Sequence, residues 1–229
     1  MSRDLSTRRI LITSGPTRAN IDSVRYMTNR SSGRLGSRIA TEALARGGRV
    51  CLVAGPGSRV PTEDEMSAEE YSRLTIREIE TVRDLLEVLR TELTEQGRHY
   101  DAVVHAMAVL DYVPVQTTDG KMRSGREEWV LKLTPTPKVI ERIKTWSPRS
   151  YLVGFKLEVD ADEVELQERA TALQRTSRAN VVVANDLSRI EGGRHPALIV
   201  GRGGEVLARC GTKAEIGREL CSILARVLG

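Results

Sequence analysis

The sequence predicts an α/β protein in which a Rossmann-like, doubly wound and mostly parallel sheet is covered by helices on both faces. Short apolar runs typical of buried strands alternate along the chain with segments of helical period. Aromatic residues make up only 3% of the 229 residues. The core must therefore be built from Val, Ile, Leu and Ala, as in a parallel sheet between helices.

The first part of the chain is expected to form one βαβ unit with a right-handed crossover. A strand over residues 9–13 ends at Ser-Gly-Pro, and a loop then extends to Gly33. The helix that follows has an apolar face of Leu, Ile and Ala and ends at a Gly-Gly pair. A second buried strand over 50–54 stops at Gly-Pro-Gly.

The alternation continues through the middle of the chain. Residues 57–73 are polar and are expected to be a loop, and residues 74–79 are expected to be a third strand. Thr81 begins an amphipathic helix with Asp84 at its N3 position, a capping-box pattern. The apolar run over 101–106 is the fourth expected strand.

Residues 111–130 interrupt this rhythm and are expected to form a mobile loop. The alternation of apolar and polar residues over 129–133 predicts a strand after it. A short helix over 138–146 and a buried strand over 152–155 complete this region.

The C-terminal part predicts a helix, a strand and a hairpin before the last helix. The helix spans about 162–178 and the strand covers 181–184. Two apolar runs that flank Gly-Arg-Gly-Gly predict an appended β-hairpin. Thr212 and Glu215 predict a capping box for the last helix. There is no internal repeat or linker, so residues 1–229 are expected to be one domain.

Composition excludes several classes of protein. A net charge of +4, without a basic run, argues against nucleic acid as a partner. No apolar stretch approaches 18 residues, so no membrane partner is expected. The three cysteines are far apart and form no CxxC, which favours reduced thiols in a cytoplasmic protein. No metal cluster has recognisable spacing, so any metal is expected to be Mg²⁺ carried in by phosphates.

Two polar segments lie where a nucleotide phosphate would bind. Residues 14–17 follow the first strand, and residues 29–36 lead into the first helix. Ligands of open α/β sheets bind beyond the carboxyl ends of the strands, and helix N-termini attract phosphate. Ser31, Ser32 and Gly36 equally fit a helix cap and close packing without a ligand. Neither a Walker A nor a clean GxGxxG is present, which argues against P-loop and ordinary dinucleotide-binding proteins.

Other polar positions are candidates for ligand contacts, and each also has a plain structural explanation. Asp111 follows the fourth strand and could hold a ribose hydroxyl or a base, or could start a turn. Lys121 and Arg123 could close over a phosphate, or lie on a solvated loop. Asn185 could pair with a substrate amide or begin a turn. His105 ends an apolar strand, where a satisfied, half-buried histidine is expected rather than a general base.

Taken together, these segments resemble the phosphopantothenate–cysteine ligase family, also called phosphopantothenoylcysteine synthetase. The resemblance extends over about residues 9–225. Many bacterial relatives are fused to a flavin-binding decarboxylase, for which 229 residues leave no room, so the chain resembles the stand-alone bacterial form. The matching segments are residues 13–17, 21–33, 35–36, 108–109, 111–112, 121, 136–140, 153–155 and 184–186.

The resemblance implies a ligase that joins 4′-phosphopantothenate to L-cysteine in coenzyme A biosynthesis. The carboxylate of 4′-phosphopantothenate is expected to attack the α-phosphate of CTP, giving an acyl-cytidylate and pyrophosphate. The amine of cysteine then displaces CMP. CTP with Mg²⁺ is the expected co-substrate, with ATP as an alternative nucleotide. A homodimer is implied, as is a separate flavin-dependent decarboxylase that acts on the product.

The resemblance also implies residue roles. Asn29 matches the asparagine that holds the acyl-nucleotidylate, and Lys121 matches a lysine of a flap at about 113–128, so these two are the catalytic candidates. Asn29, Arg30 and Asn185 are the candidates for substrate binding. The nucleotide-binding candidates are Gly15, Ser31, Ser32, Gly33, Gly36, His105, Ala106, Asp111, Lys121, Pro137, Lys138, Val139, Ile140 and Phe155.

The chain departs from the family pattern at several positions. The expected flap has fewer lysines than in fused relatives, and Leu173 and Ser177 stand where those relatives carry lysines. Contacts to the triphosphate, and the preference for CTP over ATP, therefore stay open at this point. Leu110 occupies a position that is usually small in the family.

Two rival functions are disfavoured by the sequence. A short-chain oxidoreductase needs a Tyr-x-x-x-Lys pair, and none of the five tyrosines is followed four positions later by lysine. A non-catalytic nucleotide-binding module would be expected to lose Asn29 or Lys121, and both are present.

Overall fold

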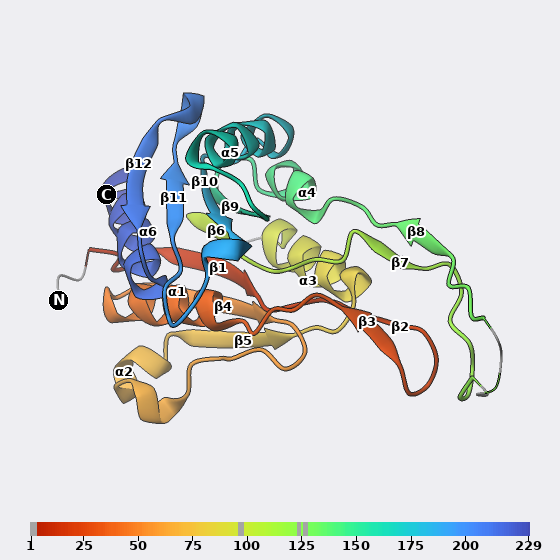
Figure 1. Cartoon of the computed structure of the whole chain (residues 1–229). Helices are drawn as coiled ribbons and strands as arrows, with labels where there is room; N and C mark the ends of the chain where they lie inside the picture. The colour runs from red at the N-terminus through yellow and green to blue at the C-terminus, as the bar shows by residue number, and fades with distance from the viewer. Residues whose placement is uncertain (1–3, 96–98, 123–124, 126–127) are drawn as a thin grey trace.

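The computed structural model describes residues 4–95, 99–122, 125 and 128–229. The flap candidate Arg123 lies outside these ranges. Within them, eight strands form one sheet (Figure 1). The strands are β1 (Arg9–Ser14), β4 (Arg49–Ala54), β5 (Leu74–Glu78), β6 (Ala102–His105), β9 (Tyr151–Glu158), β10 (Val181–Asp186), β11 (Ala197–Val200) and β12 (Val206–Cys210).

The order of the strands confirms the predicted fold class. From one edge the sheet runs β5-β4-β1-β6-β9-β10, and all these neighbours pair in parallel. This is the order 3-2-1-4-5-6 of the doubly wound fold. The remaining strands β11 and β12 add an antiparallel hairpin beside β10. The order in which successive strands are added reverses between β1 and β6, so the carboxyl ends of these two strands are the expected ligand site.

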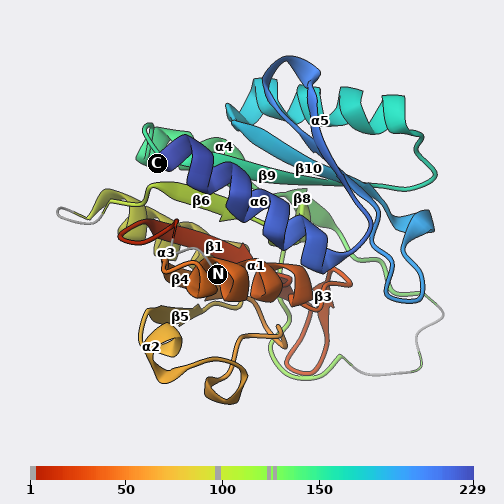
Figure 2. The same cartoon turned by 90° about the vertical axis from the view of Figure 1, so that its left-hand side faces the viewer.

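Helices cover both faces of the sheet, with α1 (Arg34–Ala45) and α6 (Lys213–Leu228) on one face. Figure 2 shows these two helices side by side in front of the sheet. The other face carries α3 (Val82–Thr94), α4 (Val139–Trp146) and α5 (Glu163–Ser177).

Alternate side chains of each central strand serve the two cores. In β1, Leu11 packs with α3 and α4, whereas Ile10 and Ile12 pack with α1 and α6. This is the two-residue period of a strand that is buried on both faces. Within the described residues, no helix combines the length and apolar character needed to cross a membrane.

The helix starts follow their capping residues, with one difference. Thr81 and Asp84 form the expected reciprocal capping box at the start of α3. In α6 the Glu215 amide donates to Thr212 Oγ1 at 3.2 Å, as expected. The Glu215 carboxylate instead accepts from the amide of Gly211 at 2.7 Å, so the expected capping box is only half formed.

Short elements were missed in segments that the sequence presents as loops. The segment before Gly33 contains the hairpin of β2 (Arg18–Asn20) and β3 (Tyr26–Thr28). The segment 57–73 contains the 3₁₀ turn η1 (Glu63–Glu65) and the short helix α2 (Ala68–Tyr71). Elements of three or four residues are too short to show a hydrophobic period, which explains why they escape prediction.

The predicted strand over 129–133 is wrong. Only its last residue enters a strand, since β8 (Leu133–Pro135) pairs with β7 (Tyr112–Pro114), which lies within the expected loop. The alternating apolar side chains do not face a core: the Trp129 ring lies under the Arg25 guanidinium, and Val130 is 67% exposed. The alternation therefore reflects contacts of a projecting ribbon. In Figure 1 the β2–β3 and β7–β8 ribbons project from the sheet on the same side.

Replacing Gly36 with Ala is expected to destabilise the fold, because α1 approaches β1 too closely for a side chain. A Cβ on Gly36 would lie 2.5 Å from Ser14 Cβ and 3.3 Å from Ser14 Cα. We expect the free energy of unfolding in urea to fall by about 1–3 kcal/mol.

The matched control is Gly217→Ala in α6, where the nearest atom to the new Cβ would be Arg38 O at 3.6 Å. There the gain in helix propensity should leave stability unchanged or raise it by up to about 1 kcal/mol. Equal effects of the two substitutions would contradict the close-packing explanation.

Candidate functional site

The site is built around the carboxyl ends of β1 and β6. Thr13 Oγ1 and His105 Nδ1 lie 2.8 Å apart, and both residues are buried. Beyond them the two chains continue side by side: the Ala108 amide donates to Gly15 O at 2.8 Å, and the Thr17 amide donates to Ala108 O at 3.2 Å. These bonds fix the two loops that border the crevice where the strand order reverses.

His105 is a satisfied core histidine, as predicted, but it is almost fully buried rather than half-buried. Burial disfavours the charged ring and lowers the pKa of His105 to about 4. The imidazole is therefore neutral at pH 7. Its expected part in a nucleotide pocket, together with Ala106, stays a prediction.

Asn29 is held firmly at the base of the β2–β3 hairpin. Its side-chain amide nitrogen donates to Ala108 O at 3.2 Å and to Val109 O at 3.1 Å. Both N–H donors of the side chain are therefore used, while Oδ1 makes no hydrogen bond with a described residue. The arrangement leaves one fixed acceptor at the edge of the crevice. Arg30, the next residue, is exposed.

The first helix starts without a side-chain cap. Its N-cap position is Gly33, with φ +69°, and no side chain accepts from the first turn. The alternative that Ser31 or Ser32 merely caps this helix is therefore wrong. Since the N–H groups of this turn lack a side-chain partner, they are available to an anion.

The glycines of this segment serve close packing, as the simpler explanation of Gly36 predicted. A Cβ on Gly36 would overlap Ser14 Oγ, which itself donates to Gly33 O at 2.9 Å. Gly15 has φ +81°, and a Cβ there would lie 2.8 Å from Ser58 Cβ. These glycines bring the end of β1, the start of α1 and the loop after β4 into contact.

Several predicted nucleotide-pocket residues meet at the start of α4. Lys138 Nζ donates to Asp111 Oδ1 at 2.6 Å, and the Thr136 amide donates to Asp111 O at 2.9 Å. Both charged side chains are more than half exposed. The remaining members differ in placement: Pro137 is exposed, Val139 is in the core, Ile140 packs on Gly154, and Phe155 packs toward the α1–α6 core.

The end of β10 supplies an amide and a carboxylate with different tasks. Asn185 is 6% exposed and its side chain makes no hydrogen bond with a described residue. Asp186 accepts from the Asp160 amide at 2.9 Å and from Ser188 Oγ at 2.6 Å. The hydrogen bond from Ser188 is the main cause that holds the pKa of Asp186 below its usual range. Asp186 therefore organises the turn, and Asn185 is the member available to a ligand.

The structure does not bring Lys121 to Asn29. The Gly120 amide donates to Ser23 Oγ at 2.9 Å, which ties the loop before Lys121 to the turn of the β2–β3 hairpin. Asn29 lies at the base of this hairpin. Asn29 is four positions after Arg25, which corresponds to about 13 Å of extended strand.

Asp22 is the centre of the contact between this loop and the hairpin turn. It is buried and accepts from Arg25 Nη2 at 2.6 Å, from the Val24 amide at 2.9 Å and from the Met122 amide at 3.2 Å. The Arg25 guanidinium also donates to Met122 O at 3.0 Å. The hydrogen bond from Arg25 holds the pKa of Asp22 far below its usual range.

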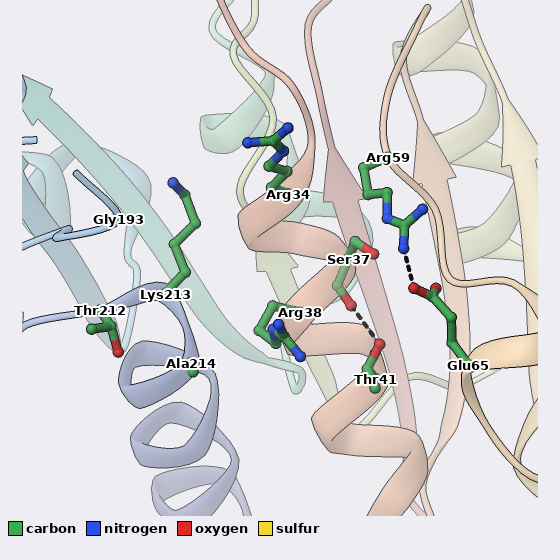
Figure 3. Close-up of a pocket in the computed structure, with 10 residues that line it drawn as sticks. All are labelled: Arg34, Ser37, Arg38, Thr41, Arg59, Glu65, Gly193, Thr212, Lys213 and Ala214. Carbon is green, nitrogen blue, oxygen red and sulfur yellow. Dashed lines mark hydrogen bonds and ion pairs between the residues drawn. The ribbon is translucent and has the colours of Figure 1, made fainter. Parts of the chain in front are cut away.

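A basic pocket beside this site was missed by the sequence analysis. It is a cavity of about 740 Å³ between the first turns of α1 and α6 (Figure 3). Its lining residues are Arg34, Ser37, Arg38, Thr41, Arg59, Glu65, Gly193, Thr212, Lys213 and Ala214. The only signal in the sequence is the pair Arg34 and Arg38, four residues apart on one helix face. Nothing in the sequence connects that face with Lys213.

The described residues do not provide a metal cage. Among them, no group of three or more His, Cys, Asp or Glu is placed to hold an ion. The carboxylates near the crevice already have partners, Lys138 for Asp111 and Ser188 for Asp186. This donor set fits a Mg²⁺ ion held mainly by phosphate oxygens and water.

The fold defines a Rossmann-like protein, and its candidate ligand site lies where the strand order reverses. Residues 5–227 match the family described as the DNA/pantothenate metabolism flavoprotein C-terminal domain. The chain belongs to this family.

Most of the curated relatives reported for the chain are bifunctional proteins of coenzyme A biosynthesis, and one is a cysteine/cysteine sulfinic acid decarboxylase that is 33% identical over 186 residues. The bifunctional protein CoaBC of Thermococcus kodakarensis is 38% identical over 227 residues, covering 99% of this chain and 53% of that protein. The chain thus spans about half the length of the curated relatives it matches. The CoaBC proteins of Methanocaldococcus jannaschii and Escherichia coli are 30% and 29% identical over 181 and 189 residues.

Two solved structures share this fold over nearly their whole length. The DNA/pantothenate metabolism flavoprotein of Streptococcus pneumoniae has a TM-score of 0.86 and 32% identity, covering 96% of this chain and all of that one. The C-terminal domain of a CoaBC protein has a TM-score of 0.77 and 30% identity, covering 99% of this chain and 98% of that one.

Replacing His105 with Asn is expected to reduce the dependence of stability on pH. The ring titrates near 6.5 in the unfolded chain and at about 4 in the folded one. The stabilisation is complete above pH 6.5 and is lost as the pH falls toward 4. Between pH 7 and pH 5, His105 should account for about 2 kcal/mol of the lost free energy of unfolding.

Urea unfolding at pH 7 and pH 5 measures this difference for each variant. His99 is exposed, so His99→Asn should retain the pH dependence of the unmodified chain. If His105→Asn also retains all of it, the ring must already be protonated in the folded state at pH 5.

Proposed function

We propose that this chain is a ligase that joins 4′-phosphopantothenate to L-cysteine at the expense of CTP. The observation that carries the proposal is Asn29, which two backbone carbonyls hold at the end of β6 while Oδ1 bonds to none of the described residues. Membership of a family whose relatives include bifunctional proteins of coenzyme A biosynthesis supports the substrate class.

The reaction has two steps. A carboxylate oxygen of 4′-phosphopantothenate forms a bond to the α-phosphorus of CTP, and the bond to the β-phosphate breaks, releasing pyrophosphate. The cysteine nitrogen then bonds to the acyl carbon, the bond from carbon to phosphate oxygen breaks, and CMP leaves while the nitrogen loses a proton. The first step creates a good leaving group for the second.

The polar groups at the crevice have distinct tasks in this proposal. The Oδ1 atom of Asn29 accepts a hydrogen bond from the acyl-nucleotidylate and positions its acyl carbon. The uncapped N–H groups at Gly33 and in the first turn of α1 bind a phosphate. Arg30 is assigned to the substrate because it is exposed directly beside Asn29.

The nucleotide base and ribose are assigned to the neighbouring strand ends. Asp111 and Lys138 present a charged pair at the start of α4, and the side-chain amide of Asn185, which bonds to no described residue, lies at the end of β10. Phe155 on β9 adds an apolar surface between them. Mg²⁺ bound to the phosphates would neutralise charge that develops at the α-phosphate.

Lys121 requires a movement of its loop to take part in this reaction. We assign residues 113–128 to a flap of a single ligase domain, which closes when the nucleotide is bound. The separation of Lys121 from the base of the hairpin supports an open arrangement of the described flap residues. Closure would bring a cation to the charge that forms on the phosphates.

We also assign a homodimer to this chain, with the two ribbons as its contact. Exposed apolar side chains gather on the ribbons, which is unusual for a solvated surface. They are Val24, Tyr26, Tyr112, Val115, Trp129, Val130 and Leu133. The product is assigned to a separate flavin-dependent decarboxylase. The three cysteines are buried free thiols, which suits a cytoplasmic enzyme.

Pyrophosphate release from the purified chain with Mg²⁺ and 4′-phosphopantothenate tests the ligase proposal. We expect release with CTP to exceed release with ATP, and product to require cysteine. Asn29→Ala and Lys121→Met should each lower kcat by about 100-fold or more, the scale for loss of a group that stabilises a transition state.

The matched control for Lys121 is Lys132→Met, an exposed lysine on the same ribbon, which should keep activity within about twofold. If no pyrophosphate is released with either CTP or ATP, the ligase proposal is ruled out. Unchanged activity of Asn29→Ala would rule out the role given to that residue.

Charging the ribbons should separate the dimer. The pair of substitutions Val130→Asp and Leu133→Asp places charges where apolar side chains are 67% and 43% exposed. Light scattering should then give the mass of a monomer, because a desolvated charge opposes burial. Val164→Asp on α5, at 63% exposure, is the control and should remain dimeric. If light scattering gives the mass of a monomer for the unmodified chain, the proposed homodimer is wrong.

A further inference from the structure

We propose that the basic pocket between α1 and α6 is a subsite for a polyphosphate chain. It takes the β- and γ-phosphates of the nucleotide, and then the pyrophosphate that they become. This inference rests on the proposed function and adds residues to the nucleotide site. Both the phosphate tail of the nucleotide and free pyrophosphate could occupy this subsite. Separate titrations with CTP and with pyrophosphate distinguish the two ligands.

The pocket carries an excess of positive charge. Arg34, Arg38, Arg59 and Lys213 line it, against the single carboxylate of Glu65. Glu65 forms an ion pair with Arg59, as Figure 3 shows. Within the described ranges, Arg34, Arg38 and Lys213 have no ion pair with a carboxylate. Three cations are thus left to face the cavity.

These cations are arranged at a cost to the fold. Arg34 and Arg38 are four residues apart on α1, a spacing at which like charges destabilise a helix. Across the pocket, partial burial lowers the pKa of Lys213, and the charge of Arg34 lowers it further. A bound anion would offset the repulsion among these cations. The arrangement is expected where a polyanion binds and is unfavourable where nothing does.

Two helix starts add to this positive potential. Figure 3 shows α1 and α6 facing each other across the pocket, with Arg34 and Arg38 on one side and Lys213 on the other. Both helices begin at this pocket, so the positive ends of their dipoles point to it. Thr212 caps α6, whereas α1 has no side-chain cap.

One wall of the pocket adjoins the segment that is proposed to bind phosphate. The Arg59 amide donates to Ser32 O at 2.9 Å, and it lies 3.2 Å from where a Cβ of Gly33 would stand. A phosphate at the first turn of α1 would therefore have the pocket directly beside it. A cavity of about 740 Å³ has room for two phosphates and their water.

Calorimetry with pyrophosphate alone tests the subsite on the complete chain. Arg38→Gln and Lys213→Gln should each weaken pyrophosphate binding by about tenfold, which corresponds to about 1.4 kcal/mol. Glu65→Gln should strengthen it by about threefold, since it removes the competing carboxylate. A gain in affinity cannot result from misfolding. Arg90→Gln, an exposed position on α3 beyond the sheet, is the charge-matched control and should bind like the unmodified chain.

The two sources of phosphate are separated by a second set of titrations. The same substitutions should weaken the binding of CTP in parallel with that of pyrophosphate. They should leave the affinities for CMP and 4′-phosphopantothenate unchanged. If the substitutions instead weaken the binding of 4′-phosphopantothenate, the inference is overturned, because the pocket would then hold the phosphate of that substrate.

Pyrophosphate affinities within twofold across all variants, or no binding to the unmodified chain, would also overturn it. A chain that binds pyrophosphate as described but releases none from CTP would retain the subsite and lose the ligase.

Discussion

The close approach of α1 to the end of β1 is the constraint on which the site depends. Ser14 fills the space that a side chain at position 36 would need, and its hydroxyl donates to Gly33 O at 2.9 Å. This contact fixes the direction in which the first turn of α1 points. The N–H groups of that turn, the arginines that follow it and the loop after β4 all take their positions from it. The phosphate-binding edge is therefore a product of backbone packing as much as of polar side chains.

Most of the sheet could be predicted because its elements are buried on a regular period. The strand over 9–13 and the helix that starts at Thr81 were recognised since each has a long apolar pattern and a defined end. The two ribbons could not be recognised in the same way. Their strands have three residues each, and each strand pairs with its hairpin partner outside the eight-stranded sheet. Trp129 is instructive, because its apolar ring stacks with a cation at the surface.

The candidate site could be predicted only where it is local in sequence. Asp111 follows the fourth expected strand and Asn29 leads into the first expected helix, so position alone predicted that both lie at the carboxyl edge of the sheet. The identity of their partners was beyond the sequence: Asn29 bonds to carbonyls about 80 residues away, and Asp111 pairs with Lys138. The basic pocket joins the starts of α1 and α6, which are nearly the length of the chain apart. The topology of the fold brings these two helix starts together. Residues so far apart in the chain produce no local pattern in the sequence.

The buried carboxylate of Asp22 has a mechanical consequence for the two ribbons. It holds the turn of one hairpin and the amide of Met122 in the other segment at the same time. Its pKa is kept far below the usual range, chiefly by Arg25, so acid does not unlock this joint in any ordinary buffer. Separation of the two segments therefore requires new hydrogen-bond partners for Asp22 and Arg25 rather than a change of pH. In the proposed closure of the flap, the Arg25 guanidinium would have to give up its hydrogen bond to Met122 O.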